Sequence, residues 1–391
     1  MQQLHIIILF IAYVSCTDVL CDAELFGATN HARNITAYES QSLECADPIT
    51  YSGIQSIEQY IQTLPPIRTV SVGVADMWDA VYYSAEEILY SATLDVAMWR
   101  RSCHDICPTN GRPSGAVDTR YATETVILLG PVKWQSGLFH FIVDGLILAA
   151  ILPANILNTA RVAIQGSNAA HQYTNVLFPQ LPVILLDPAV NYRFKRAYLP
   201  SGNTCGWSTA LHYTAIHTLT PKCHFNGSRY VLFSGRRGLG RHMPNWDDII
   251  SAYKQAYPSH TIREHLGTEP AADAFCLFRH AHTVIGLHGA GLTHLIACQQ
   301  GTFVIEITPY PYAPRMAVQR CYADMACKLG LIYTFIPVPG DHGGYRTRLN
   351  IREFLHRVAA VYAYTTSFSH SHGRPHRRAS PQTSRNNPAR P

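Results

Sequence analysis

The stretch from Thr283 to Ile307, TVIGLHGAGLTHLIACQQGTFVIEI, holds the pattern that decides the fold. A run of β-branched and apolar residues ends at His288, and glycine occupies positions 289 and 291. A short apolar segment follows, and a second apolar run begins after Gly301. This order predicts a strand, a tight turn, a helix and a second strand, which is the repeating unit of a parallel sheet.

The same kind of strand is expected at several other places. Short β-branched runs bounded by Gly, Pro or Asp lie at residues 70–74, 125–130, 161–166 and 182–187, and further strands are expected at residues 229–234, 260–265 and 331–338. Helices are expected at residues 137–152, 246–257, 269–281, 316–330 and 351–364. In the second of these, Asn245 is the expected N-cap and Asp248 occupies the capping-box position. Strands that alternate with helices predict an α/β protein whose parallel sheets are covered by helices.

Composition narrows the class of protein. The chain has 391 residues, 47% of them apolar, and a formal net charge of +5. Residues 367–391 contain five arginines and no acidic residue, so the rest of the chain is formally neutral. We therefore expect a globular protein with a disordered basic tail and no nucleic-acid partner.

The N-terminus predicts entry into the secretory pathway. The apolar run at residues 6–14 is too short for a membrane span and is typical of a signal peptide, although no basic residue precedes it and an uncleaved anchor stays open. Apart from such an anchor we expect no membrane association. Asn34 and Asn226 lie in glycosylation acceptor tripeptides. The 11 cysteines also indicate an oxidising compartment, the lumen of the endoplasmic reticulum or Golgi or the outside of the cell.

Three disulfide pairings are suggested by proximity in the sequence. Cys103 with Cys107, Cys205 with Cys223, and Cys321 with Cys327 are candidates. The first pair lacks the second ligand pair that a zinc site needs, so we expect no metal there.

The glycine turn after His288 is a candidate binding site. Ligands of open parallel sheets bind beyond the carboxyl ends of the strands, and glycine lets the backbone approach a ligand closely. A helix N-terminus suits a diphosphate, and a carboxylate such as Glu306 can accept hydrogen bonds from ribose hydroxyls. The alternative is a plain strand-to-helix turn with a core histidine.

The order SGRRGLGRHMPN, VIGLHGAGLTHLIACQQGTFVIEITP and CYADMACKLGLIY resembles glycosyltransferase family 61 across residues 136–338. The resemblance implies two Rossmann-like domains of the GT-B type facing a cleft, in inverting enzymes of the secretory pathway. It implies donor-binding roles for the residues that match the family pattern: Arg236, Arg241, His288, Gly289, Ala290, Gly291, Leu292 and Thr293, with Glu306 beside them. Where the family often has Ser-Arg, this chain has Ser234-Gly235-Arg236. Asp324 matches an aspartate after Cys-Tyr, or else pairs within its own helix.

In the first half, Phe139-His140 and Asp144 resemble the family's aromatic-His followed four residues later by Asp. Positions four apart share one face of a helix, so His140 and Asp144 are the candidates for the catalytic base. Their alternative role is to pair with each other and hold the helix. The sequence has no Asp-x-Asp motif, so we expect no metal and no other cofactor.

These observations predict a signal peptide at residues 1–21, an acceptor-side α/β domain at 22–222, a nucleotide-sugar domain at 223–340, a closing helix at 341–366 and a disordered tail at 367–391. The expected function is inverting, metal-independent transfer of GlcNAc or a pentose such as xylose from a UDP-sugar to a hydroxyl of a glycan or glycoprotein. The alternatives are an inactive nucleotide- or glycan-binding module on the same fold and another Rossmann-type enzyme, against which the missing GxGxxG pattern argues.

Overall fold

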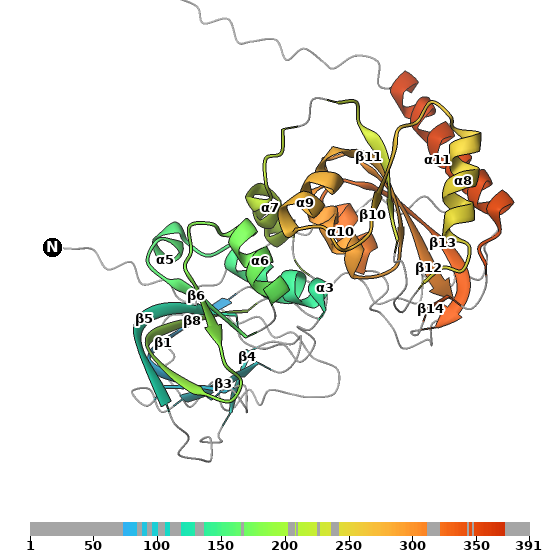
Figure 1. The fold of residues 1–391 in the computed structure, drawn as a ribbon. Coiled ribbons are helices and arrows are strands. Elements are labelled where there is room, and N and C mark those ends of the chain that lie inside the picture. Colours follow the sequence, from blue (N-terminus) through green and yellow to red (C-terminus); the bar gives the residue numbers. More distant parts are fainter. Residues whose placement is uncertain are drawn as a thin grey trace, which may run out of the picture. The chain divides into compact units, whose positions relative to one another are not determined.

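The computed structural model describes residues 73–83, 88–91, 96–100, 106–109, 119–129, 137–165, 168–201, 208, 210–224, 227–235, 242–310, 321–341, 344–345 and 348–371. The chain divides into two compact units, one ending at Leu349 and the other beginning at Asn350. The first unit contains two β-sheets with their helices (Figure 1). The predicted signal peptide and Asn34, Asn226, Arg236 and Arg241 lie outside the described residues.

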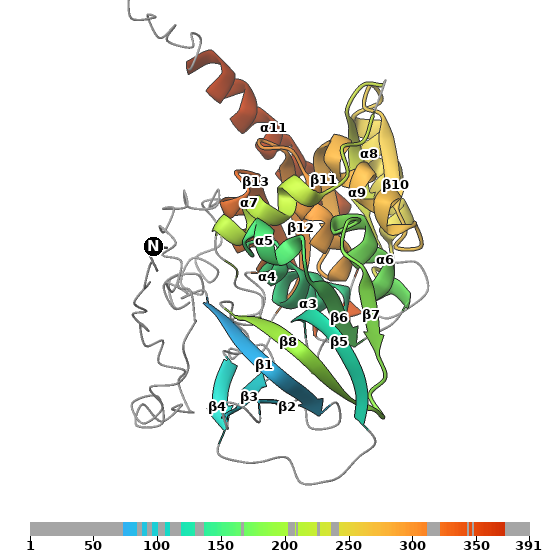
Figure 2. The same cartoon turned by 90° about the vertical axis from the view of Figure 1, so that its left-hand side faces the viewer.

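The first sheet has eight strands in the order β4-β3-β2-β1-β8-β5-β6-β7. These are β1 (Gly73–Tyr83), β2 (Ile88–Ser91), β3 (Val96–Arg100), β4 (Ile106–Thr109), β5 (Thr119–Leu128), β6 (Arg161–Gln165), β7 (Val183–Leu186) and β8 (Asn191–Ser201). Strands β5, β6, β7 and β8 pair in parallel, whereas β1 pairs antiparallel with β8 and β2, and β2, β3 and β4 continue antiparallel. Figure 2 shows β1 and β8 side by side.

The expectation of parallel sheets was therefore wrong for half of this sheet. Strands β1 to β4 follow one another through short connections, and a parallel pair needs a crossover of about a dozen residues or more. Two further elements were not predicted at all, the long strand β8 and the meander β2–β4. Of the predicted strand at residues 70–74, Gly73 and Val74 belong to β1, and the remainder lies outside the described residues.

Along the chain, the helices of the first half that precede Val183 lie between parallel strands of the first sheet, and a last helix follows β8. They are α3 (Leu138–Phe141), η1 (Ile142–Leu146), α4 (Ile147–Ala149), α5 (Ala154–Leu157), α6 (Asn168–Leu177) and α7 (Ala210–Leu219). The predicted helix at residues 137–152 is confirmed as α3, η1 and α4, and η1 is a π-helical turn that contains Asp144. Single π turns within α-helices are rare and are frequent at functional sites.

The second sheet is parallel apart from its last strand. Its order is β10-β9-β11-β12-β13-β14. The strands are β9 (Tyr230–Ser234), β10 (Ile262–His265), β11 (Ala281–Leu287), β12 (Phe303–Tyr310), β13 (Ile332–Asp341) and β14 (Gly344–Tyr345), and the helices are α8 (Trp246–Ala256), α9 (Ala271–His280), η2 (Ala290–Ala297) and α10 (Cys321–Lys328). The alternation predicted from the sequence is confirmed, but η2 is a 3-10 helix.

The cap of α8 differs in detail from the prediction. Asn245 occupies the N-cap position, yet its side chain makes no capping hydrogen bond. Instead its Nδ2 donates to the Leu349 oxygen at 2.9 Å, and its Oδ1 accepts from the Leu349 nitrogen at 3.0 Å. Asp248 forms an ion pair with Arg348 at 2.5 Å. The side chains of Asn245 and Asp248 therefore bind residues 348 and 349, the last residues of the first unit.

Among the described residues, two hydrophobic clusters of the first unit can be defined. The larger one combines helices α3 to α7 with buried residues of both sheets, such as Ile127, Val162, Leu232 and Val304. The smaller one consists of strand residues such as Met77, Val126 and Phe194. Because successive residues of a strand point to opposite faces, Val126 and Ile127 belong to different clusters. Strand β5 is thus buried on both faces, as expected for a central parallel strand.

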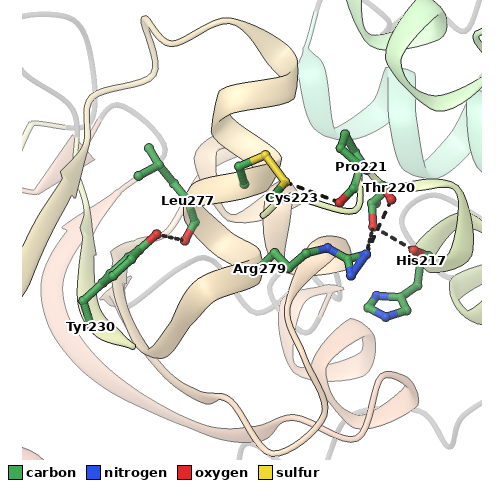
Figure 3. The surroundings of a disulfide bond; sticks show 8 residues. His217, Thr220, Pro221, Cys223, Tyr230, Leu277 and Arg279 are labelled. Carbon is green, nitrogen blue, oxygen red and sulfur yellow. Dashed lines mark hydrogen bonds between the residues drawn. A yellow bond between two sulfur atoms is a disulfide. The ribbon is translucent and has the colours of Figure 1, made fainter. Parts of the chain in front are cut away.

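Two of the three predicted disulfide pairings were wrong. Cys223 bonds to Cys276, 53 residues further on, beside the contact of Arg279 with Thr220 (Figure 3). Cys321 is free and buried, whereas Cys327 is disulfide-bonded. Two residues six apart on a helix are about 9 Å apart along its axis, beyond the reach of a disulfide. Cys103 lies outside the described residues.

The second unit contains α11 (Ile351–Ser371), with Phe354, Val358 and Val361 buried. The helix expected at residues 351–364 is confirmed but continues to Ser371, so residues 367–371 are not the disordered start of a tail. Extending a formed helix costs little, because each added residue gains one hydrogen bond. Among the described residues, no helix combines the length and the apolar character needed to cross a membrane.

Candidate active site

The turn after β11 lies at the edge of the second sheet where the parallel strands end. The backbone nitrogen of His288 donates to the Ile307 oxygen on β12 at 2.8 Å and also lies 3.0 Å from the hydroxyl of Tyr345. That hydroxyl in turn donates to the Ile307 oxygen at 2.6 Å. The turn therefore starts from a fixed position, at the edge where ligands of parallel sheets bind.

Glycine is needed at this turn for two separate reasons. Gly289 has a φ of 152° and a ψ of 179°, a region that is essentially restricted to glycine. At Gly291 an added Cβ would lie 3.0 Å from the Ser234 hydroxyl and 3.4 Å from the His265 ring. The backbone of the turn is consequently strained at one residue and closely packed at the other.

The side chain of His288 is paired with Glu306. Nδ1 of His288 lies 2.5 Å from Oε1 of Glu306, and because a carboxylate only accepts, the ring donates from Nδ1. The His288 side chain is 8% exposed and that of Glu306 is 1% exposed. The other oxygen of Glu306 accepts a hydrogen bond from the Tyr333 hydroxyl.

This geometry changes the expectation for Glu306. The sequence predicted that it would accept hydrogen bonds from ribose hydroxyls, but both of its oxygens already have protein donors and its side chain is buried. Here Glu306 is the partner of His288. Burial and the negative charge of Glu306 raise the pKa of Tyr333 well above its ordinary value, so its hydroxyl stays a donor.

A second histidine–carboxylate pair lies on the helix of the first half. Nδ1 of His140 lies 2.6 Å from Oδ2 of Asp144. The His140 side chain is 25% exposed, whereas that of Asp144 is fully buried. The two residues therefore do pair with each other, and the histidine is the member that solvent or a ligand can reach.

Aromatic rings connect the two pairs. The Phe139 ring contacts His140 edge-on at a centroid distance of 5.3 Å and Tyr322 at 5.3 Å, and Tyr322 contacts His288 at 5.5 Å. Tyr322 also donates from its hydroxyl to the Gly289 oxygen at 2.6 Å. Residues about 150 positions apart in the chain are thus brought together around Tyr322.

Asp324 does not join these pairs. Its Oδ2 lies 2.7 Å from Nζ of Lys328 on the same helix, and Lys328 also donates to the Ser208 oxygen at 2.7 Å. Pairing within its own helix was the alternative for Asp324, and it is what the structure contains.

The remaining residues of the turn belong mainly to the core. The side chains of Leu292 and Thr293 are fully buried, and Ala290 and Gly291 are partly exposed. Leu292 and Thr293 could therefore contact a nucleotide-sugar substrate only through their backbone atoms. The first N–H groups of a helix lack partners within it, so the start of η2 presents donors near His288.

The second histidine of the turn has a structural position. His294 donates from Nδ1 to the Gly291 oxygen at 2.8 Å and accepts at Nε2 from the Tyr173 hydroxyl at 2.7 Å. Burial lowers the pKa of His294 to about 3, so the ring is neutral at ordinary pH. This contact joins α6 of the first half to η2.

The glycine that precedes Arg236 has a packing role. A Cβ on Gly235 would lie 2.3 Å from Nε1 of Trp246, so the indole occupies the space a side chain would need. This contact accounts for glycine where the family pattern often has a different residue. Both Arg236 and Arg241 belong to the stretch outside the described residues, so their donor-binding role stays a prediction.

Three tyrosines of this site were not predicted from the sequence: Tyr322, Tyr333 and Tyr345. Each acts through a hydrogen bond to a residue that is distant in the chain. Tyr322 and Tyr333 had a weak signal, because both lie within the quoted stretch CYADMACKLGLIY, whereas Tyr345 had none. Within the described part of the chain, no group of three or more His, Cys, Asp or Glu side chains could hold a metal ion.

Similarity to individual known proteins is low. No curated protein is similar enough in sequence to match the chain. Among solved structures, the chain is similar to the dodecameric iron-containing heptosyltransferase TibC in complex with ADP-D-β-D-heptose, with 13% identity, a TM-score of 0.32, and coverage of 79% of this chain and 97% of that one. It is also similar to TibC from enterotoxigenic E. coli, with 12% identity, a TM-score of 0.30, and coverage of 78% and 86%. Scores this low carry no argument about this chain.

The match to a protein family is more specific. The family model of Glycosyltransferase 61 matches residues 138–305, which begin just before His140 and end just before Glu306. The match includes Asp144, the turn at His288 and the strands between them. It confirms, over residues 138–305, the resemblance to glycosyltransferase family 61 predicted from the sequence, and it supports a glycosyltransferase.

Proposed function

We propose that the protein is an inverting, metal-independent glycosyltransferase that moves GlcNAc or a pentose such as xylose from a UDP-sugar to a hydroxyl of a glycan or glycoprotein. The observation that carries the proposal is the pairing of two histidines with two buried carboxylates on either side of Phe139 and Tyr322. Sugar transfer needs two tasks at one place, removal of a proton from the acceptor and stabilisation of the leaving diphosphate.

The donor side is assigned to the turn at His288. Its ring, protonated at Nε2 and held at Nδ1 by Glu306, and the N–H groups at the start of η2 supply hydrogen-bond donors that are fixed before the substrate binds. Arg236 and Arg241 are proposed as further ligands of the diphosphate, because a guanidinium binds phosphate oxygens in a bidentate manner. These hydrogen-bond donors would stabilise the negative charge of the leaving diphosphate, which a divalent cation does in other transferases.

The acceptor side is assigned to His140 and Asp144. The acceptor hydroxyl would give its proton to Nε2 of His140 while its oxygen attacks the anomeric carbon and the bond to the diphosphate breaks. Nδ1 of His140 faces Asp144, which orients the ring and stabilises the imidazolium that forms. A single displacement of this kind inverts the anomeric centre.

The location proposed for this reaction is the lumen of the secretory pathway, on the basis of the N-terminal sequence and the disulfide between Cys223 and Cys276. Expression in animal cells tests it. The protein should carry N-glycans at Asn34, Asn226 or both, and amidase treatment should increase its gel mobility. Unglycosylated protein in the cytosol would contradict the proposed location.

Ligand-dependent melting tests the function. UDP at a concentration about 100-fold above its dissociation constant should stabilise the protein by about 2.7 kcal/mol, and NAD should not. A panel of UDP-sugars with glycoprotein acceptors should then give UDP release with at least one donor. Stabilisation by UDP with no turnover of any donor would favour the inactive binding module, and stabilisation by NAD alone would favour another Rossmann-type enzyme.

A further inference from the structure

Glu306 is a buried carboxylate whose two oxygens have two different donors. Oε1 faces Nδ1 of His288 at 2.5 Å, and the second oxygen accepts from the Tyr333 hydroxyl. A buried carboxylate is costly unless it is fully hydrogen-bonded. Tyr333 therefore does more than fill space, because it satisfies the half of Glu306 that His288 does not reach.

The position of Tyr333 makes it a dependable donor. It lies on β13, next to the strand that carries Glu306, with Tyr333 opposite Val304 and Phe335 opposite Glu306 in the register. Burial and the charge of Glu306 keep its pKa well above the ordinary value of a tyrosine. Its hydroxyl proton consequently stays in place across the pH range in which a histidine titrates.

We propose that Tyr333 is a positioning residue for the transfer reaction: through Glu306 it holds the Nδ1–H of His288 and directs Nε2 to the leaving diphosphate, to which Nε2–H donates when the ring is protonated. The inference rests on the function proposed above. Tyr333 contacts Glu306, and Glu306 contacts His288. His288 would in turn contact the diphosphate of the nucleotide sugar. Tyr333 itself does not touch the substrate.

Other charged and titratable groups surround this chain of contacts. Cys321 and Tyr322 on α10 face Tyr333, and Glu306 lies beside Cys321. Asp144 and Asp324 also act on Cys321 from η1 and α10. Except for His288, these neighbours are acidic or neutral, so Tyr333 and His288 supply the donors that Glu306 receives.

Removing the Tyr333 hydroxyl has a predictable direction. Among the described residues, His288 is then the remaining side-chain donor to Glu306, and the negative charge of Glu306, no longer shared with the hydroxyl, acts more strongly on the His288 ring. Loss of the proton from the pair then becomes harder, because hydrogen bonds to the charged form of a carboxylate favour that form. The His288 ring in Tyr333→Phe should therefore release its proton at a higher pH, by about one pH unit.

The experiment is a titration of the histidine rings by nitrogen-15 NMR in the full-length wild type, Tyr333→Phe and a control. The spectrum of His288→Gln identifies the His288 signals. The control is Tyr230→Phe, which removes a tyrosine hydroxyl that donates to the Leu277 oxygen at 2.8 Å in a similarly part-buried bond. We expect a shift of about one unit to higher pH in Tyr333→Phe and none in Tyr230→Phe.

Kinetics on the same proteins connect the shift to the reaction. Tyr333→Phe should lower kcat about tenfold or more, change the donor KM less than threefold, and move the pH–rate profile in the same direction as the NMR titration. An unchanged His288 titration, or a shift equal to that of Tyr230→Phe, would overturn the inference. Failure of the proposed function would look different, because wild-type protein would then neither bind UDP nor release it from any UDP-sugar.

Discussion

The hydroxyl of Tyr322 donates a 2.6 Å hydrogen bond to the backbone oxygen of Gly289, so helix α10 holds the glycine turn in place. The same ring lies between Phe139 and His288. One tyrosine thus fixes the backbone of the proposed donor site and separates it from the proposed acceptor site. Its side chain is buried, so it acts on the position of the turn and not through solvent.

Tyr322→Phe should keep the ring contacts with Phe139 and His288 but lose the hydrogen bond that fixes the turn at Gly289. We expect a loss of about 1 kcal/mol in the free energy of unfolding, the usual net value of one hydrogen bond, with a fall in UDP affinity and in kcat. Tyr253→Phe is the matched control, because it removes a buried hydroxyl bonded to His260 at 2.7 Å. Calorimetry and UDP titration should show similar losses of stability in both variants and a loss of UDP affinity in the first alone.

Gly289→Ala should damage the turn through its backbone. The conformation of Gly289 is costly for any other residue, by about 1–3 kcal/mol, so the turn should shift or the protein should lose that stability. Gly301→Ala is the control, since Gly301 also has a positive φ of 79° but has open space around it. Denaturant unfolding and UDP release should show that both variants lose stability while only Gly289→Ala loses most activity.

Acid should destabilise the protein through its buried histidines. Burial lowers the pKa of His212 and His294 to about 3 and that of His282 to about 4, below the value of about 6.5 expected in the unfolded chain. The unfolded state then binds more protons, so stability is complete above pH 6.5 and falls as the pH decreases toward 3, by about 1.4 kcal/mol per pH unit for each of the fully buried His212 and His294 and by less for the half-buried His282.

Urea unfolding between pH 7 and 4 measures this slope. His282→Gln should reduce it, because that variant removes one of the groups that take up a proton on unfolding. A midpoint that does not change between pH 7 and 4 would show that these rings are already protonated in the folded protein.

Chelation tests how the diphosphate is held. We expect full transfer activity in EDTA, because the proposed site uses His288, backbone N–H groups and arginines as donors. Initial rates with and without EDTA, followed by addition of manganese, measure this. Activity that disappears with the chelator and returns with manganese would show that a metal is required.

The second sheet was predictable because its signals are local. Strands β9, β11 and β12 are short buried runs of apolar and β-branched residues, and Gly289 and Gly330 mark turns where φ is positive. Strand β8 also has a period-two pattern, with Tyr192 and Phe194 buried and Lys195 exposed, but its charged residues concealed it.

The partners of the site residues were less predictable, for a physical reason. The bonds from Tyr322 to Gly289 and from Tyr333 to Glu306 join residues 33 and 27 positions apart, and the disulfide joins residues 53 apart. Such contacts depend on how elements pack. The pairing of His140 with Asp144 could be predicted, because positions four apart on a helix share a face.

The contrast between His288 and His294 tests the central claim most directly. His288→Ala removes the ring that faces Glu306 at the proposed site, and His294→Ala removes a buried ring bonded to Tyr173 and Gly291. Soluble yield, melting temperature and UDP release should be measured on the same preparations. We predict that His288→Ala folds, melts within a few degrees of the wild type and loses about a hundred- to thousandfold in turnover, the usual loss for one preorganised donor. His294→Ala should instead lose stability, with activity that follows its folded fraction. A well-folded His288→Ala with wild-type turnover would contradict the account.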